Sequence, residues 1–205
     1  MRKSVLFLYI TLIFYTLIHL VFFFSNQGAL ESLLKLEGDP LLLTLFNLLG
    51  IYPLAFMIFS IKYMVITKKA WIPLILSFGL GGFAVTPLFI KRTYQRQKIE
   101  KYVSLLALIA LILSVMLLGF GLILGDYQVF IDAFLNDSFI HIMTIDFIAL
   151  TILSILVSKQ VSKSYWISAI PLVGFLYMLF SEWHVSNYVF FFTIWTSKQV
   201  TCVLK

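Results

Sequence analysis

Asp146 and His141 are the residues with the clearest chemical potential, because both lie inside the apolar run 138–158. Counted as helix from Ser138, Asp146 lies about 12 Å and His141 about 5 Å into this run. An ionised carboxylate at that depth must be paired, hydrated or protonated, so Asp146 is a candidate proton or cation site, or a general base. The alternative is a buried acid bonded to a hydroxyl or amide of a neighbouring helix.

His141 and Asp146 do not form a dyad on a regular helix. Five residues turn the helix by about 500°, which leaves the two side chains about 140° apart and unable to converge on one metal ion. His141 instead shares a face with Thr144, three residues later. An interfacial or helix-packing histidine is the alternative interpretation of His141.

Other polar residues are expected at a similar depth, near the same end of their helices. They are His19, Asn47, Glu182 and His184. Together with His141 and Asp146 they predict one outward-facing polar cavity. Terminal His and Trp residues that simply mark the membrane interface are the alternative.

Glycines form two further groups. Gly79, Gly81 and Gly82 lack the Lys-Ser/Thr of a phosphate loop, so they predict close helix approach or a turn of the chain. Gly121 and Gly125, four residues apart, predict a helix-packing face.

No metal, cofactor or catalytic motif appears in the sequence. Cys202 is the only cysteine, which excludes an internal disulfide and a CxxC metal site. There is no nucleophile elbow, HExxH motif or His-rich box. An enzyme is therefore the less favoured interpretation, and no cofactor is expected.

The elements that position these residues must lie in a lipid bilayer. Of the 205 residues, 61% are hydrophobic and 12% are charged, whereas soluble domains have about 45–50% and about 25%. This composition excludes a secreted disulfide scaffold, a disordered chain and a soluble enzyme. The net charge of +6 comes from short loops between apolar runs, which indicates membrane orientation and not nucleic-acid binding.

Six apolar runs are about as long as a bilayer-spanning helix. They are residues 4–24, 41–66, 71–90, 102–124, 138–158 and 166–181, and a shorter seventh run covers 188–196. Because the runs are continuous and do not alternate, they predict helices. The expected fold is an all-α, polytopic membrane bundle of about six segments in a single domain, 1–205, with residues 4–24 as an uncleaved first span.

The basic residues favour an unusual path for residues 71–90. Simple alternation of six spans leaves seven Lys/Arg on the inner side and eight on the outer side. If 71–90 is re-entrant, turning at its glycines, and the tail also returns, 14 of the 15 basic residues are cytoplasmic, together with the N-terminus. A Gly-rich span followed by a basic outer loop is the alternative.

The basic run 91–101 is interpreted mainly as a topology signal. Contact with anionic lipid is a second interpretation, worth about 1 kcal/mol per basic residue near the surface.

A short internal similarity predicts a repeat of residues 1–90 and 91–185. Lys69-Ala70-Trp71-Ile72-Pro73-Leu74 is similar to Lys163-Ser164-Tyr165-Trp166-Ile167, with Pro171-Leu172 shortly after. Both stretches follow an apolar run and a short basic loop, as in transporters with parallel repeats.

Three stretches carry a resemblance to a known family. They are Phe46–Pro53, Leu76 to Pro87, and Ser138–Phe147 with its His141 and Asp146. Over residues 40–180 the chain resembles an uncharacterised family of small polytopic membrane proteins from cyanobacteria and chloroplasts. The resemblance implies that Asn47, His141 and Asp146 belong to recurring motifs, and it implies no activity.

Three classes of function are compatible with the sequence. The favoured one is a non-enzymatic protein of the bacterial plasma membrane that binds or passes a small solute, ion or proton near Asp146. The second is an intramembrane enzyme acting on a lipid or isoprenoid, with Asp146 and His141 as acid and base. The third is a scaffold whose glycine faces pack against a protein partner or a second copy.

Overall fold

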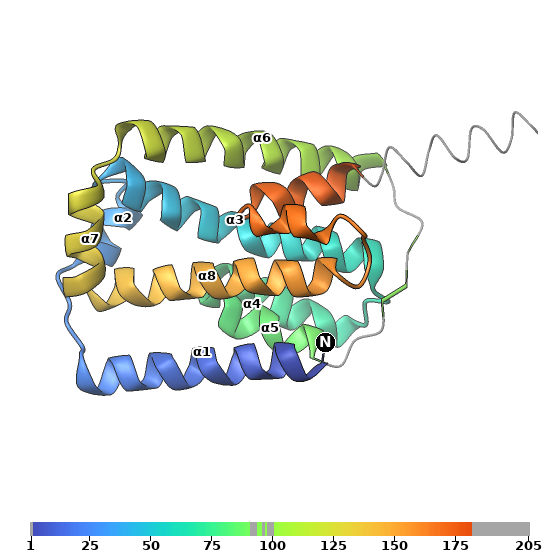
Figure 1. Ribbon diagram of the computed structural model, residues 1–205, viewed down its shortest axis with the longest axis horizontal. Helices are drawn as coiled ribbons and strands as arrows, with labels where there is room; N and C mark the ends of the chain where they lie inside the picture. The colour runs from blue at the N-terminus through green and yellow to red at the C-terminus, as the bar shows by residue number, and fades with distance from the viewer. Residues whose placement is uncertain (1, 91–93, 96, 98–100, 182–205) are drawn as a thin grey trace, which may run out of the picture.

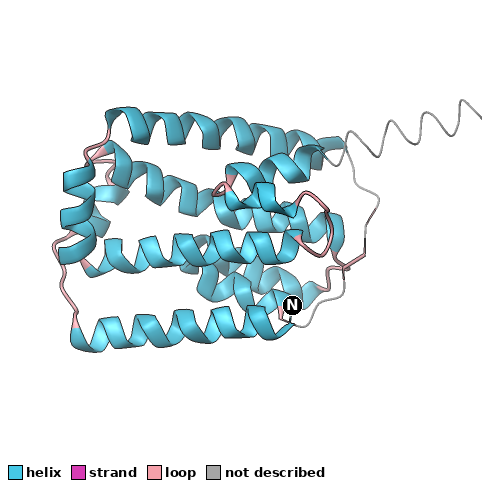
Figure 2. Cartoon of the chain, in the orientation of Figure 1, coloured by secondary structure: helices cyan, strands magenta, loops and turns pink. Residues whose placement is uncertain are grey.

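The computed structural model describes residues 2–90, 94, 95, 97 and 101–181, and this part of the chain is helical without strands (Figure 2). The prediction of an all-α fold is therefore confirmed there. The α-helices are α1 (Arg2–Phe22), α2 (Ala29–Leu34), α3 (Pro40–Tyr63), α4 (Trp71–Leu80), α5 (Gly82–Phe89), α6 (Lys101–Leu124), α7 (Tyr127–Asn136) and α8 (Ser138–Ser158). The 3₁₀ turns η1 (Lys68–Ala70) and η2 (Tyr165–Ala169) precede α4 and a last helical stretch, 173–181.

Four helices, α1, α3, α6 and α8, are long and apolar enough to cross a membrane. The shortest of them have 21 residues, about 31 Å at 1.5 Å per residue, which matches a hydrocarbon core of about 30 Å. The expectation of about six full spans is not confirmed, because the runs 71–90 and 166–181 are each broken into shorter pieces.

Acidic residues of the loops start three of the helices. The side chains of Asp39, Asp126 and Asp137 accept backbone N–H groups in the first turns of α3, α7 and α8. Such N-caps satisfy donors that have no partner within the helix. Pro40 follows Asp39 at the first position of α3, where a missing N–H costs nothing.

The long helices form a bundle in which α3 and α8 run in the same direction and α1 and α6 run in the opposite one (Figure 1). α6 lies against α3, and α1 lies against α8. The core between them contains Phe56, Phe59, Phe89 and Phe175, all fully buried. α1 buries only Val5 and Leu12, so most of its apolar surface faces outward, as expected for a helix in lipid.

Residues 71–90 form a hairpin of two short helices. Between α4 and α5 lies a single residue, Gly81, whose φ of +55° and ψ of −131° suit glycine. Beyond the hairpin, the backbone N–H of Gln95 donates to Tyr63 O at 2.8 Å. The chain therefore leaves the hairpin at the end of α3, where it entered.

A second hairpin follows α8. Its tip is Leu172, with a φ of +56°, and helix 173–181 returns toward the end of α3, where Lys62 Nζ donates to Leu179 O at 2.6 Å. Each half of the chain thus has the same order of elements: a long helix, a short helix, a long helix and a hairpin (Figure 1).

Charges segregate to the two ends of the bundle. The basic end, where α1 starts and α3 ends, carries the described Arg2, Lys3, Lys62, Lys68, Lys69, Lys159 and Lys163. The acidic end, at α2 and α7, carries Glu31, Glu37, Asp39, Asp126, Asp132 and Asp137, with Lys35 as its only described Lys or Arg.

Candidate functional site

Asp146 contacts the tip of the first hairpin. Its side chain is 3% exposed, and both carboxylate oxygens accept the backbone N–H of Gly82 at 3.0 Å. Gly82 is the first residue of α5, and a helix N-terminus carries partial positive charge that stabilises an anion. The hairpin therefore holds Asp146 through its backbone.

Glycine is required at this tip for steric reasons. A Cβ on Gly81 would overlap Asp146 Oδ2, and a Cβ on Gly82 would lie 2.5 Å from Oδ1. Only residues without a side chain let the backbone approach the carboxylate so closely. These two glycines thus act as a turn and as a binding surface for Asp146.

The carboxylate retains unused acceptor capacity. Two carboxylate oxygens offer about four acceptor positions, whereas Gly82 N–H is the only hydrogen-bond donor to them among the described residues. In the same part of the chain no Lys, Arg or His pairs with Asp146, since the only ion pair found is Lys35–Glu31.

Asp146 lines a cavity of about 660 Å³. The walls come from α2, α3, α4, α5 and α8, and are formed by Leu30, Leu34, Phe46, Asn47, Leu49, Gly50, Ile51, Ser77, Phe78, Gly79, Leu80, Gly81, Phe83, Phe139, Ile142, Met143 and Asp146. Most of these side chains are apolar, and Asp146 is the only charged one. Cavities of this size and character accept small ligands.

Three other polar features border the cavity. Asn47 donates its amide to Leu43 O at 2.7 Å, and Ser77 donates its hydroxyl to Leu74 O at 2.6 Å. The third is the C-terminal turn of α4 at Gly79 and Leu80, since the last carbonyls of a helix lack intrahelical partners and carry partial negative charge. The Asn47 carbonyl, the Ser77 hydroxyl oxygen and the last carbonyls of α4 therefore remain as acceptors, beside one unused N–H of the Asn47 amide.

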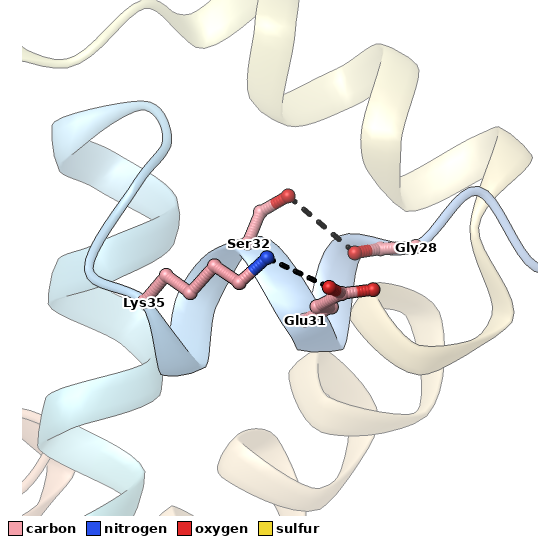
Figure 3. A network of polar contacts seen from close by, with 4 residues as sticks. All are labelled: Gly28, Glu31, Ser32 and Lys35. Carbon is pink, nitrogen blue, oxygen red and sulfur yellow. Dashed lines mark hydrogen bonds and ion pairs between the residues drawn. The ribbon is translucent and has the colours of Figure 1, made fainter.

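The short helix α2 covers one side of the cavity with Leu30 and Leu34. Polar groups of α2 and its N-cap bond to one another: Lys35 Nζ pairs with Glu31 at 2.7 Å, and Ser32 Oγ donates to Gly28 O at 3.5 Å (Figure 3). This pattern places an apolar face of α2 on the cavity without exposing unpaired charge to it.

His141 and His19 lie outside the cavity, in a separate stack between α1 and α8. Their rings are 4.1 Å apart. His141 Nδ1 lies 2.9 Å from Phe134 O, and because a carbonyl only accepts, Nδ1 carries a proton. In neutral His141, Nε2 then accepts from Tyr15 OH at 2.6 Å.

The cluster expected from the sequence is therefore divided. Asp146 and Asn47 share the cavity, whereas His19 and His141 join α1 to α8. Thr144 donates to Ile140 O in its own helix at 2.8 Å. Glu182 and His184 lie outside the described residues.

The second glycine pair lies at the contact of α6 with α3. A Cβ on Gly121 would lie 2.5 Å from Thr44 Oγ1, and one on Gly125 would lie 2.6 Å from Leu41 Cβ. Gly79 differs from both, since a Cβ there would meet no atom within 4 Å. It borders the empty space of the cavity.

Several residues at the basic end could not be interpreted from the sequence. Lys62, near the end of the apolar run 41–66, lies in α3 and is 2% exposed. Burial raises the pKa of the nearby Tyr94 phenol, whose hydroxyl has no partner among the described residues. Two predicted features lie outside what the structure describes. They are the basic side chains of 91–101, which were predicted to contact anionic lipid, and the seventh apolar run, 188–196.

Tyr52 is the residue whose role the sequence did not indicate. Its buried hydroxyl lies 2.7 Å from Thr151 Oγ1 and accepts the Leu172 N–H at 3.0 Å. The tip of each hairpin is thus bound by a long helix of the other half, Gly82 by α8 and Leu172 by α3. Tyr52 lies within the apolar run 41–66, and no local pattern indicates a partner 120 positions away.

No group of three or more His, Cys, Asp or Glu able to hold a metal ion occurs in the described part of the chain. Comparison of the whole chain with models of protein families, with curated proteins and with solved structures found no match. The resemblance to the family from cyanobacteria and chloroplasts stays a prediction.

Proposed function

We propose that the protein is an integral membrane protein that binds a small solute, ion or proton in the cavity at Asp146 and passes it across the bilayer. The observation that carries the proposal is a buried carboxylate with one N–H donor, at the wall of a cavity about 660 Å³ in volume. A buried acid without a cationic partner is costly in a membrane, so its presence there points to a functional role.

The charge distribution supports an orientation for this protein. Basic residues favour the cytoplasmic side, and the described ones gather at the basic end, which includes Arg2 and Lys3. We place this end in the cytoplasm of a bacterial cell, so both hairpins enter the membrane from that side. Re-entrant backbone is tolerated where protein covers it or where it lines a cavity, and the first tip lines the Asp146 cavity.

The other two classes of function have less support. An acid–base pair requires Asp146 and His141 at one substrate, but His141 is bonded to Tyr15 and Phe134 outside the cavity. A scaffold that docks through Gly121 and Gly125 requires a free glycine face, but α3 already covers it through Thr44 and Leu41.

Proton flux into proteoliposomes tests the proposal. Vesicles of the full chain, loaded with a pH-sensitive dye, should acidify faster after an external acid pulse than vesicles without protein. Asp146→Asn should reduce the rate to the protein-free level, whereas Asp132→Asn, an exposed acid on α7, should leave it unchanged. Equal rates for wild type and Asp146→Asn would overturn a role of Asp146 in the passage of protons.

Filling the cavity provides a second test. In a Cys202→Ser background, Gly79→Cys should lose flux after reaction with a bulky maleimide, because Gly79 borders the cavity. Gly119→Cys is the matched control, since a Cβ there also meets no atom within 4 Å but Gly119 lies on α6, outside the cavity lining. Loss of flux in both variants, or in neither, would argue against passage through this cavity.

A further inference from the structure

We infer that the cavity takes an amphiphilic monocation, such as a protonated amine or a quaternary ion with an apolar body, that enters from the lipid. A ligand of this class presupposes the solute-binding cavity of the proposed function and specifies its charge, its shape and its route of entry.

The charge of the ligand follows from the groups that face the cavity. Asp146 is the only ionisable residue in the lining, and it retains unused acceptor capacity beside Gly82 N–H. The C-terminal turn of α4 adds partial negative charge at Gly79 and Leu80. Among the described residues no Lys, Arg or His lines the cavity, so a positive charge on the ligand would supply the partner that Asp146 lacks there.

The apolar body follows from the rest of the wall. Phe46, Phe78, Phe83 and Phe139 line the cavity with aromatic rings, and ring faces attract a cation within about 6 Å of their centres. A bare metal ion would need several oxygen ligands, whereas only Asp146, Asn47, Ser77 and the α4 terminus supply oxygen here. A cation that carries its own apolar groups matches both kinds of surface.

The route follows from exposure at the edge of the cavity. Leu34, Phe78 and Leu80 line it and are 65%, 53% and 56% exposed. On a chain that spans a membrane, exposed apolar side chains on α4 face lipid and not water. A ligand that partitions into the bilayer can therefore reach Asp146 without crossing a charged rim.

Binding of two ions of nearly equal shape and opposite charge tests this inference. Tetraphenylphosphonium and tetraphenylborate are titrated into the detergent-purified full chain, with Asp132→Asn as the matched acid control. Asp146→Asn should weaken binding of the phosphonium at least about tenfold, because a charge pair in a partly buried site is worth more than that. Binding of the borate should not weaken, and Asp132→Asn should change neither affinity.

A second variant, Gly79→Phe, tests binding in the cavity independently if Asp146→Asn does not fold. Gly79→Phe places a ring in the cavity and should abolish phosphonium binding, whereas Gly119→Phe on α6 should not. Size-exclusion elution of each variant establishes that it is folded before titration.

The outcomes separate the ligand class from the proposed function. Phosphonium binding that is unchanged in Asp146→Asn, or no binding above the Gly79→Phe background, overturns the cationic class. Flux that still depends on Asp146 in the proteoliposome assay would then leave the proposed function standing. Proton flux and phosphonium binding that are both independent of Asp146 overturn the proposed function itself, whereas phosphonium binding that depends on Asp146 without such proton flux supports the cation over the proton.

Discussion

The backbone N–H of Gly82 donates to both carboxylate oxygens of Asp146, at 3.0 Å each, and so joins the tip of the first hairpin to the middle of α8. The N–H of Leu172, at the tip of the second hairpin, donates to Tyr52 OH on α3 at 3.0 Å. A long helix of each half thus accepts a backbone N–H from the hairpin tip of the other half. The position of each tip therefore depends on contacts from both halves of the chain.

Gly82→Ala should destabilise the protein, because the new Cβ would lie 2.5 Å from Asp146 Oδ1. Overpacking of this kind costs about 1–3 kcal/mol. The effect is measured as the free energy of unfolding in mixed micelles. In an Asp146→Ala background the same change should cost less, since the clashing carboxylate is gone. A cost that is equal in both backgrounds would contradict the contact between the tip and Asp146.

Tyr52→Phe should also lower the free energy of unfolding. It removes the acceptor of the buried Leu172 N–H, and a buried donor without a partner costs about 1–3 kcal/mol. Tyr9→Phe is the matched control on α1, because Tyr9 OH forms no hydrogen bond with the described residues. If both variants unfold like the wild type, Tyr52 does not hold the second hairpin.

Gly121→Val should weaken the contact of α6 with α3. Its Cβ alone would lie 2.5 Å from Thr44 Oγ1, which donates to Leu117 O at 3.0 Å. Because Thr44 cannot move away without losing that hydrogen bond, a loss of about 1–3 kcal/mol is expected. Gly119→Val, on the same helix but with no atom within 4 Å of its Cβ, should cost much less. The midpoints of thermal unfolding of the two purified variants are compared directly. Equal midpoints would contradict the close contact of Gly121 on α6 with Thr44 on α3.

A cysteine at residue 95 should be accessible from the cytoplasm. Gln95 is exposed and its backbone bonds to the end of α3, at the basic end. In a Cys202→Ser background, Gln95→Cys should react with a membrane-impermeant maleimide from the same side as Lys163→Cys, and Asp132→Cys should react from the opposite side. Labelling of Gln95→Cys together with Asp132→Cys would reject the hairpin topology of 71–90.

The long helices could be predicted from hydropathy because each one satisfies its backbone internally and needs only about 20 apolar residues to span a bilayer. α1, α3, α6 and α8 follow four of the expected runs closely. The runs 71–90 and 166–181 have the same composition, but breaks at Gly81 and Leu172 turn them into hairpins. A glycine signalled the first break, whereas a leucine with positive φ gives no such signal.

The residues of the candidate site were partly visible in the sequence. Asp146 was identifiable because a carboxylate inside an apolar run is costly, and helix periodicity already separates it from His141 by about 140°. Lys62 was not identifiable as buried, since a lysine near the end of an apolar run usually reaches the interface.

The sequence by itself determined that the protein lies in a lipid bilayer, where its long helices are, and that Asp146 is a buried acid in need of a partner. These features depend only on composition and on spacing within one helix. The tertiary structure alone decided that Gly82 of one half meets Asp146 of the other, that His19 stacks on His141 away from the cavity, and that α3 covers Gly121. Those contacts join residues 64 to 122 positions apart along the chain, and they form only through the way the helices pack. No local pattern specifies which helix faces which, because packing energy depends on the whole bundle.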